Sequence, residues 1–328
     1  MMKIILIGLG SMGKRRIRLL KKRGDVDQII GVDSNPERRS EVTQLYGIET
    51  AESIQKAIEI DAFDCAFVCT SPLSHNSIIY ECLQHKLHVF TEINLVSDGY
   101  EANIELSNMV GKYLFLSSTF LYREETQYIA EKVKAQNAPV NYIYHIGQYL
   151  PDWHPWESYK NFFVGNKRTN GCREIMAIEM PWLTEAFGEI DSVAAIHGTM
   201  SSLGLNYDDN YMIQITHKNG NKGSLIIDVV CRKAIRNFEV YSENLYLSWD
   251  GTPQGLEEYN IEAKTLNQIQ LYRSIEHMDG YQATVIENAY ENEIEEFFAV
   301  VRGDKDQTYG FEKDLTTLKW LDRIEGIQ

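Results

Sequence analysis

The sequence is poor in the features that mark secreted, metal-binding and membrane-spanning proteins. No apolar run reaches the ~18 residues that a membrane span requires, and a strand-like run stands at the N-terminus in place of a leader peptide. The cysteines are scattered, with neither a paired framework nor the spacing of zinc ligands. They are Cys65, Cys69, Cys82, Cys172 and Cys231. These absences favour a reducing cytoplasm, and we expect no bound metal.

Positive charge is also scarce. The chain has 32 Lys and Arg against 47 Asp and Glu, which gives a net charge of −15. Nucleic acids and anionic membranes both need a cationic surface, so we expect neither as a partner. The one basic run, residues 14–23, interleaves its charges with Ile17, Leu19 and Leu20 at helical spacing. It therefore predicts the solvent-exposed face of a helix.

The length fits roughly two domains of average size, and no proline- or serine-rich linker separates the halves. The first half alternates apolar, β-branched runs with helical patterns. The expected strands cover residues 3–10, 28–33, 64–71, 88–93 and 114–119. Strands that alternate with helices form βαβ units, so residues 1–121 predict an α/β domain with a parallel sheet.

The rhythm changes from residue 122 onward. Period-two runs occupy much of residues 192–250, joined by turn signals such as NGNKG at 219–223. Alternation of this kind predicts an antiparallel sheet with one covered face. Two helical patterns then close the chain. Residues 122–328 therefore predict a second, α+β domain built on a large, mostly antiparallel sheet.

A glycine-rich turn follows the first expected strand and has the form G-x-G-x-x-G. Its residues are Gly8, Leu9, Gly10, Ser11, Met12 and Gly13. The glycines permit a tight turn, close approach of the backbone to a diphosphate, and close packing of helix on strand. The N-terminus of the following helix then receives the negative charge. The motif in this context predicts a dinucleotide site.

An acid stands where such a site needs one. Asp33 ends the next expected strand, twenty positions after Gly13. Its carboxylate is expected to bind the adenosine ribose hydroxyls and to repel a 2′-phosphate, which favours NAD over NADP. Arg38 and Arg39 lie close enough in sequence to leave NADP open.

Two further strand ends carry polar residues. Thr70, Ser71 and Pro72 end one expected strand, where an open parallel sheet binds its ligand. We expect these residues to bind the cofactor, together with His75 in the following helix and with Glu92 and Asn94 after the next strand. A lone histidine more often packs or ends a helix, so His75 receives no catalytic role.

Together, the glycine turn, Asp33, the T-S-P-x-x-x-H stretch at 70–75 and the H-V-F-T-E strand at 88–92 resemble the Gfo/Idh/MocA family of oxidoreductases. The double acid Asp208–Asp209 before a strand fits the same pattern. The resemblance implies a Rossmann domain followed by a large mixed sheet, whose outer face commonly makes dimers or tetramers. It also implies a last helix, about residues 311–328, that returns to the first domain, and sugar-like or cyclitol substrates.

Two positions depart from the family pattern. The family usually ends the strand at 88–92 in Glu-Lys-Pro, and its lysine reaches both the nicotinamide and the substrate. Here Glu92 matches, but Ile93 stands for the lysine. A second family signature, Asp followed four residues later by His, falls on Glu174 and Ile178. Isoleucine cannot titrate, so the usual lysine and histidine mechanism does not carry over.

The segment at 149–174 is the strongest candidate to replace them. It crowds ionisable residues around Trp153 and Trp156, and indole faces stack on sugar rings. We expect proton transfer from Lys160, His154 or Glu174, with Tyr159 a further possible base, and substrate contacts from Trp153, Tyr159, Arg173 and Glu179. Arg173 would suit an anionic substrate group. The alternatives are aromatic residues that pin a long surface loop and a simple charge pair at a helix start.

The leading interpretation is an NAD(H)-dependent oxidoreductase of a sugar, nucleotide sugar or sugar acid, with hydride transfer at nicotinamide C4. It would form a homodimer or homotetramer. Two alternatives stay open. One is an enzyme that retains NAD and uses a transient oxidation for elimination or hydrolysis. The other is a catalytically silent nucleotide-binding protein, for which the two isoleucines argue.

Overall fold

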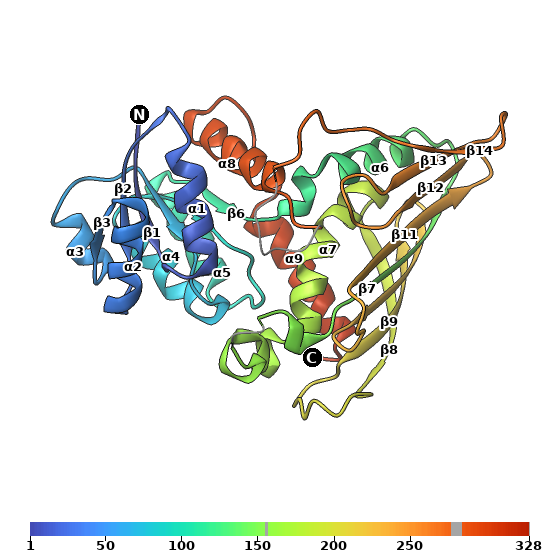
Figure 1. Ribbon diagram of the computed structural model, residues 1–328, viewed down its shortest axis with the longest axis horizontal. Coiled ribbons are helices and arrows are strands. Elements are labelled where there is room, and N and C mark those ends of the chain that lie inside the picture. The colour runs from blue at the N-terminus through green and yellow to red at the C-terminus, as the bar shows by residue number, and fades with distance from the viewer. Residues whose placement is uncertain (155–156, 277–283, 328) are drawn as a thin grey trace. The chain divides into compact units, whose positions relative to one another are not determined.

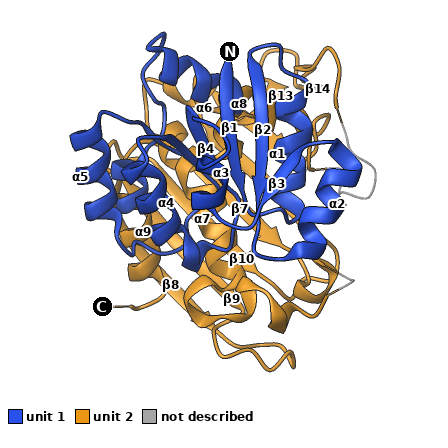
Figure 2. Cartoon of the chain, turned by 90° about the vertical axis from the view of Figure 1, so that its left-hand side faces the viewer, with its two compact units in different colours: residues 1–117, 294–315 blue, residues 118–293, 316–328 orange. Residues whose placement is uncertain are grey.

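The computed structural model describes residues 1–154, 157–276 and 284–327 (Figure 1). The chain divides into two compact units (Figure 2). Unit 1 is Met1–Ser117 with Ile294–Leu315, and unit 2 is Ser118–Glu293 with Thr316–Gln328. The division after Ser117 lies close to the one expected at 121, but unit 1 also takes a late segment that the sequence assigned to the second domain.

Unit 1 is built on a six-stranded parallel sheet in the order β3-β2-β1-β4-β5-β6. The strands are β1 Met2–Ile7, β2 Val26–Val32, β3 Glu49–Ala51, β4 Cys65–Val68, β5 His88–Thr91 and β6 Leu114–Leu116. The sequence predicts all of them except β3, which is only three residues long. Chain order reverses between β1 and β4, and an open sheet of this kind binds its ligand at that switch point.

The helices of unit 1 begin and end at recognisable signals. They include α1 Ser11–Lys21, α2 Pro36–Tyr46, α3 Ile54–Ile58, α4 His75–Gln84 and α5 Tyr100–Val110. Asn35 caps α2 by accepting from the N–H groups of Glu37 and Arg38, and Gly47 ends it with a φ of 64°.

The core of unit 1 includes a row of aromatic rings. Phe67, Phe90 and Phe115 are stacked neighbours on β4, β5 and β6, with centroids 4.7 and 5.3 Å apart. Phe297 from α8, Glu287–Arg302, meets Phe90 edge-on at 5.5 Å. Ring pairs of this geometry add to the stability that burial provides.

The basic run at 14–23 is only partly the exposed face that the sequence predicts. Arg15 and Arg16 on α1 are 3% and 0% exposed, whereas Lys21 and Lys22 are exposed. The prediction was wrong for these two arginines, which are buried; Arg16 contacts Phe90 and Glu92 at the end of β5.

Unit 2 is built on an eight-stranded mixed sheet in the order β14-β13-β12-β11-β7-β10-β9-β8. Only the β7–β10 pair is parallel among its paired strands. The strands are β7 Asn141–Gly147, β8 Ile190–Gly198, β9 Asn210–His217, β10 Lys222–Asp228, β11 Ile235–Ser242, β12 Leu245–Trp249, β13 Leu256–Asn260 and β14 Thr265–Gln268. The large, mostly antiparallel sheet expected from the sequence is therefore present.

Helices cover one face of this sheet (Figure 1). They include α6 Glu124–Lys134 and α7 Gly171–Phe187. Tyr142 and Tyr144 on β7 contact Phe187 and Trp182 on α7, with centroids 4.2 and 5.7 Å apart. The last helix, α9 Phe311–Ile324, is divided between the two units after Leu315. Within the described ranges, no helix has both the length and the apolar character needed to cross a membrane.

Candidate active site

The three glycines of the turn after β1 meet three different requirements. Gly8 has a φ of +92°, and a Cβ there would lie 2.7 Å from the carbonyl oxygen of Cys69. A Cβ at Gly13 would lie 1.9 Å from the carbonyl oxygen of Gly8, so α1 can pack against the turn only with glycine there. A Cβ at Gly10 would meet nothing within 4 Å, so the backbone there is open to a ligand.

The start of α1 fits a diphosphate. Gly10 is the N-cap, no side chain caps the helix, and its first turn, from Ser11 and Met12 onward, holds no acid. Uncapped amides and the positive end of the helix dipole attract an anion. The NAD diphosphate would therefore be held by the backbone of residues 8–13.

Asp33 is fixed against this turn. One carboxylate oxygen accepts from the Leu9 N–H at 2.9 Å and the other from the Asn35 N–H at 2.9 Å. A carboxylate held by two backbone donors is well placed to accept from a ribose diol. Arg38 lies 3.6 Å from Asp33 with its side chain 55% exposed, while Arg39 donates to the Asp33 carbonyl. Arg38 is thus the better-placed residue for a 2′-phosphate.

The end of β4 is held by a histidine. Thr70, Ser71 and Pro72 form a turn into α4, and Ser74 donates to the Thr70 hydroxyl at 2.9 Å. His75 is 2% exposed, and its Nε2 lies 2.9 Å from the Thr70 carbonyl oxygen. Burial lowers the pKa of His75. His75 therefore helps to hold this turn in place through the Thr70 carbonyl, and its buried ring has little surface left to contact a cofactor.

The end of β5 is held in a similar way. Glu92 is 8% exposed, and Arg16 donates to its two oxygens at 2.6 and 3.2 Å. Asn94 is 2% exposed, and its Oδ1 lies 2.6 Å from His75 Nδ1. Ile93 between them is partly exposed. The direct cofactor contact expected from Glu92 is thus corrected, because its carboxylate is turned inward to Arg16.

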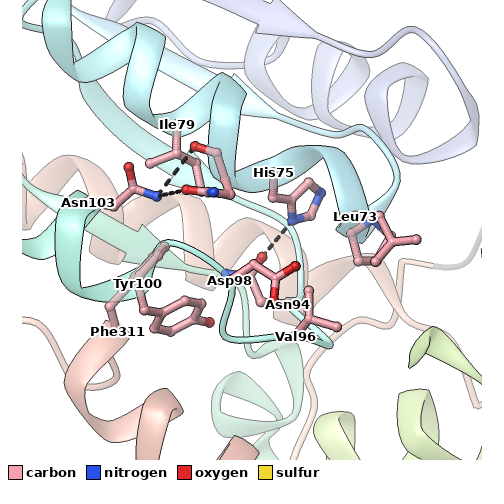
Figure 3. Close-up of a pocket in the computed structure, with 11 residues that line it drawn as sticks. Leu73, His75, Ile79, Asn94, Val96, Asp98, Tyr100, Asn103 and Phe311 are labelled. Atoms are coloured by element: carbon pink, nitrogen blue, oxygen red, sulfur yellow. Dashed lines mark hydrogen bonds between the residues drawn. The ribbon is translucent and has the colours of Figure 1, made fainter.

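A small cavity lies beside the His75–Asn94 pair (Figure 3). Its volume is about 10 Å³, and its lining includes Tyr100 and Phe311 as well as that pair. A space of this size admits about one water molecule. The cavity is therefore too small for the cofactor. The candidate cofactor site in unit 1 is formed by the carboxyl ends of β1, β2, β4 and β5.

In unit 2, the described part of the segment at 149–174 forms short 3-10 turns before α7 begins at Gly171, and several of its polar groups are already hydrogen-bonded. Trp153 donates to the Gln148 carbonyl at 3.2 Å, and Tyr159 donates to the Leu203 carbonyl at 2.8 Å. His154 stacks on Phe162 at 4.5 Å, and burial lowers its pKa. Lys160 is exposed. Trp156 lies outside the described residues.

Arg173 is 3% exposed at the start of α7. It donates to Asp322 at 2.6 Å and also forms an ion pair with Glu325. Two carboxylates already balance its charge, so an anionic substrate would have to displace one of them. The structure thus gives Arg173 a role in anchoring the end of α9 to α7, which differs from the substrate contact that the sequence predicts.

Glu179 is 0% exposed in the core of unit 2. Tyr144 and Trp182 donate to one of its oxygens at 2.9 and 2.7 Å, and Arg236 lies 2.6 Å from the other. Its carboxylate has no surface left for a substrate. The expected substrate contact is corrected to a structural one, because the periodicity of α7 turns this residue to the sheet.

Glu174 stands apart from these paired groups. It lies in the first turn of α7, and its Oε2 is buried with no hydrogen-bond partner among the described residues. Burial raises its pKa from 4.5 to about 8. The side chain as a whole is half-buried, so the carboxyl combines one buried oxygen with access to its surroundings. Its raised pKa favours the protonated form at neutral pH, and a group of this kind can exchange a proton.

The sequence misses two partners that decide these roles. Arg16, the partner of Glu92, is hidden in the basic run, although it lies three residues after Gly13 on the same face of α1. Arg236, the partner of Glu179, begins a strand far along the chain. Helical spacing from Gly13 is a signal for the first, and we find none for the second.

Solved structures resemble nearly the whole chain. One is an oxidoreductase from Agrobacterium radiobacter in complex with NAD+, L-tartaric acid and magnesium, with 12% identity, a TM-score of 0.81, and 99% of this chain and 96% of that chain covered. Another is the WlbA dehydrogenase from Bordetella pertussis in complex with NADH and UDP-GlcNAcA, with 14% identity, a TM-score of 0.77 and coverage of 99% and 96%. A levoglucosan dehydrogenase in complex with NADH has 16% identity, a TM-score of 0.78 and coverage of 99% and 96%. At these identities the likeness shows the fold.

Sequence comparison assigns the family. None of the curated proteins matches the chain. Residues 2–103 match the family described as "Oxidoreductase family, NAD-binding Rossmann fold", and this range includes the glycine turn, Asp33 and the ends of β4 and β5. Residues 2–103 thus form an NAD-binding Rossmann domain of the Gfo/Idh/MocA oxidoreductase family.

Proposed function

We propose that this oxidoreductase acts on a sugar, a nucleotide sugar or a sugar acid. Bound NAD(H) would supply or accept a hydride at C4 of the nicotinamide, and the reacting substrate carbon would bear a hydroxyl or carbonyl oxygen. The geometry of the glycine turn and Asp33 supports the use of NAD. The substrate class is supported by two similar structures, one in complex with UDP-GlcNAcA and the other a levoglucosan dehydrogenase.

Glu174 is the proposed proton-transfer group. Hydride transfer at such a carbon needs a proton to be moved at the attached oxygen, and positions 93 and 178 hold isoleucine. The observation that carries the proposal is the buried Oε2 of Glu174, which has no hydrogen-bond partner in the part of the chain that the structure describes, together with a pKa raised to about 8. Its neutral form can give a proton to a carbonyl oxygen, and its ionised form can accept one from a hydroxyl.

The remaining candidates have supporting roles in this proposal. Trp153 offers an indole face for a sugar ring, and Tyr159 holds the segment on the loop at Leu203. His154 and Lys160 are weaker candidates for proton transfer, because the first is stacked on Phe162 and the second is exposed.

The test replaces Glu174 with glutamine, which keeps the shape and removes the titration. We expect kcat to fall about 10²–10⁴-fold, the typical contribution of a general acid–base group, with NADH affinity unchanged. Glu185→Gln is the matched control, because Glu185 is an exposed residue of the same helix paired with Lys134. A Glu174→Gln enzyme with the wild-type rate and pH profile would exclude this role.

The net reaction is tested separately. Substrate turnover is measured by chromatography while NADH is followed by its absorbance. Equal changes in the two support the oxidoreductase. Substrate loss with no net change in NADH would favour the alternative in which retained NAD supports elimination or hydrolysis. If calorimetry detected no binding of NAD, NADH or NADPH, the proposal that the protein is an NAD-dependent enzyme would be refuted.

We also propose that unit 2 makes a homodimer or homotetramer through the outer face of its sheet. Ile196, Met212 and Ile226 are cross-strand neighbours on that face, and the first two are 77% and 54% exposed. A patch of this kind marks an interaction surface. Met212→Asp should lower the mass measured by light scattering, whereas Met109→Asp, at an exposed position on α5, should not.

A further inference from the structure

We propose that two buried side-chain pairs, Arg16–Glu92 and His75–Asn94, form a clamp that positions the end of β5 for the nicotinamide half of the cofactor. Arg16 and Asn94 are then positioning residues. The inference rests on the proposed use of NAD(H), and it assigns to these side chains a role other than direct contact with the ligand.

The first pair joins β5 to the cofactor helix. Arg16 is 0% exposed, and its Nε and Nη2 donate to the two oxygens of Glu92 at 2.6 and 3.2 Å. Nη2 also donates to Ser117 after β6 at 3.1 Å, and the guanidinium lies 4.5 Å from the centroid of Phe90. A two-pronged contact fixes direction as well as distance. Residue 92 is therefore held in one place relative to α1.

The second pair joins β5 to the turn after β4. His75 Nδ1 lies 2.6 Å from Asn94 Oδ1 (Figure 3). Nε2 of the same ring lies 2.9 Å from the Thr70 carbonyl oxygen. His75 and Asn94 are each 2% exposed. The ring thus links two neighbouring strand ends. Of residues 91–94, Ile93 alone is partly exposed, between the two anchors.

The topology assigns this clamp to one half of the cofactor. The diphosphate site is the turn after β1, and Asp33 places the adenosine ribose on the β2 side of it. The sheet order puts β4 and β5 on the opposite side of β1. The half that remains, nicotinamide and its ribose, must therefore lie over the ends of β4 and β5.

The adenosine side does not depend on the clamp. Gly13 packs on the Gly8 carbonyl, and Leu9 donates to Asp33, without help from Arg16. Loss of the clamp should therefore weaken binding of the whole dinucleotide and leave unchanged the binding of a ligand that lacks both the nicotinamide and its ribose. ADP is such a ligand.

The test measures calorimetric affinities of NADH and ADP for the full-length protein. Arg16→Lys keeps the charge and loses the two-pronged contact. We expect the Kd of NADH to rise about tenfold or more, the loss typical of a hydrogen bond to a charged group, with the Kd of ADP near wild type. Asn94→Ala should show the same pattern, a higher Kd for NADH and a Kd for ADP near wild type. In turnover assays, kcat at saturating NADH should fall as well.

Lys21→Met is the control, since it removes an exposed cation from the same helix. Equal weakening of the binding of both ligands would refute the clamp, and so would unchanged affinities in both Arg16→Lys and Asn94→Ala. If the variants lost stability but bound the two ligands with equally changed affinities, the two side-chain pairs would have a structural role only. Failure of the wild-type protein to bind either ligand would instead refute the proposed function.

Discussion

Glu92 in unit 1 and Glu174 in unit 2 are the same residue type with buried oxygens, and their surroundings are opposite. Glu92 receives two hydrogen bonds from Arg16, itself fully buried. Glu174 has a buried oxygen that receives none from the described residues. Burial disfavours an unpaired charge, so the two carboxyls differ in what surrounds them: a guanidinium lies against Glu92, whereas the pKa of Glu174 is raised by burial.

Helix α7 repeats the contrast within five residues. Glu179 is paired with Arg236 and accepts from Tyr144 and Trp182. Glu174 on the preceding turn has a buried oxygen to which none of the described residues donates. Paired carboxylates hold elements together. An unpaired one is unfavourable for folding, and such groups cluster at functional sites. The comparison separates the structural acids from the one that we propose acts in the reaction.

The largest effect should come from removing the partner of Glu92. Arg16→Met leaves a buried carboxylate without a counter-charge, which costs about 3–5 kcal/mol of unfolding free energy. Urea unfolding at neutral pH measures this loss of unfolding free energy. The double variant Arg16→Met/Glu92→Gln carries no unpaired charge and should recover part of the loss. A single variant as stable as the wild type would show that Glu92 is not held as the hydrogen bonds indicate.

A smaller effect, with a distinctive pH dependence, should come from Glu174→Gln. Folding raises the pKa of Glu174 to about 8 from 4.5, so between these pH values the folded state binds a proton that the unfolded state has lost. The wild type should then lose about 1.4 kcal/mol per pH unit relative to the variant as pH rises through this window, or about 2–3 kcal/mol between pH 5 and 7. Below this pH window the unfolding free energies of the wild type and the variant should change with pH in parallel. Denaturant unfolding across this pH range measures the difference.

A constant difference in stability at every pH would mean that Glu174 ionises in the folded protein as it does in the unfolded chain. Glu185→Gln is the matched comparison, because it removes an exposed carboxylate from the same helix by the same substitution.

The parts of the fold that the sequence predicts are those with local signals. The glycine turn, Asp33 and the alternation of strands and helices depend on neighbours a few residues away, and each is present in unit 1. The short β3 carries too few residues to show a pattern.

The roles of the carboxylates could not be read in this way, because their partners are distant. Arg16 and Glu92 are 76 positions apart, and Arg173 meets Glu325 across 152 positions. The sequence predicts substrate binding by Arg173 and Glu179 from their residue types and position, but in the folded chain both form ion pairs with distant residues. Glu174 stands out only when the absence of such a contact can be seen.

The smallest effect is expected at Lys160. Its side chain is exposed, with the ammonium 5.9 Å from the centroid of Tyr159, so it can contribute to a substrate contact at the surface but lacks the burial that tunes a proton-transfer group. Exposed ionic contacts are worth up to about 1 kcal/mol, and Lys160→Ala should therefore lower kcat/KM by about fivefold or less, without changing the pH profile. Steady-state kinetics beside Glu174→Gln measure the contrast. If Lys160→Ala abolished turnover while Glu174→Gln did not, the acid–base role would pass from the unpaired carboxyl to the lysine.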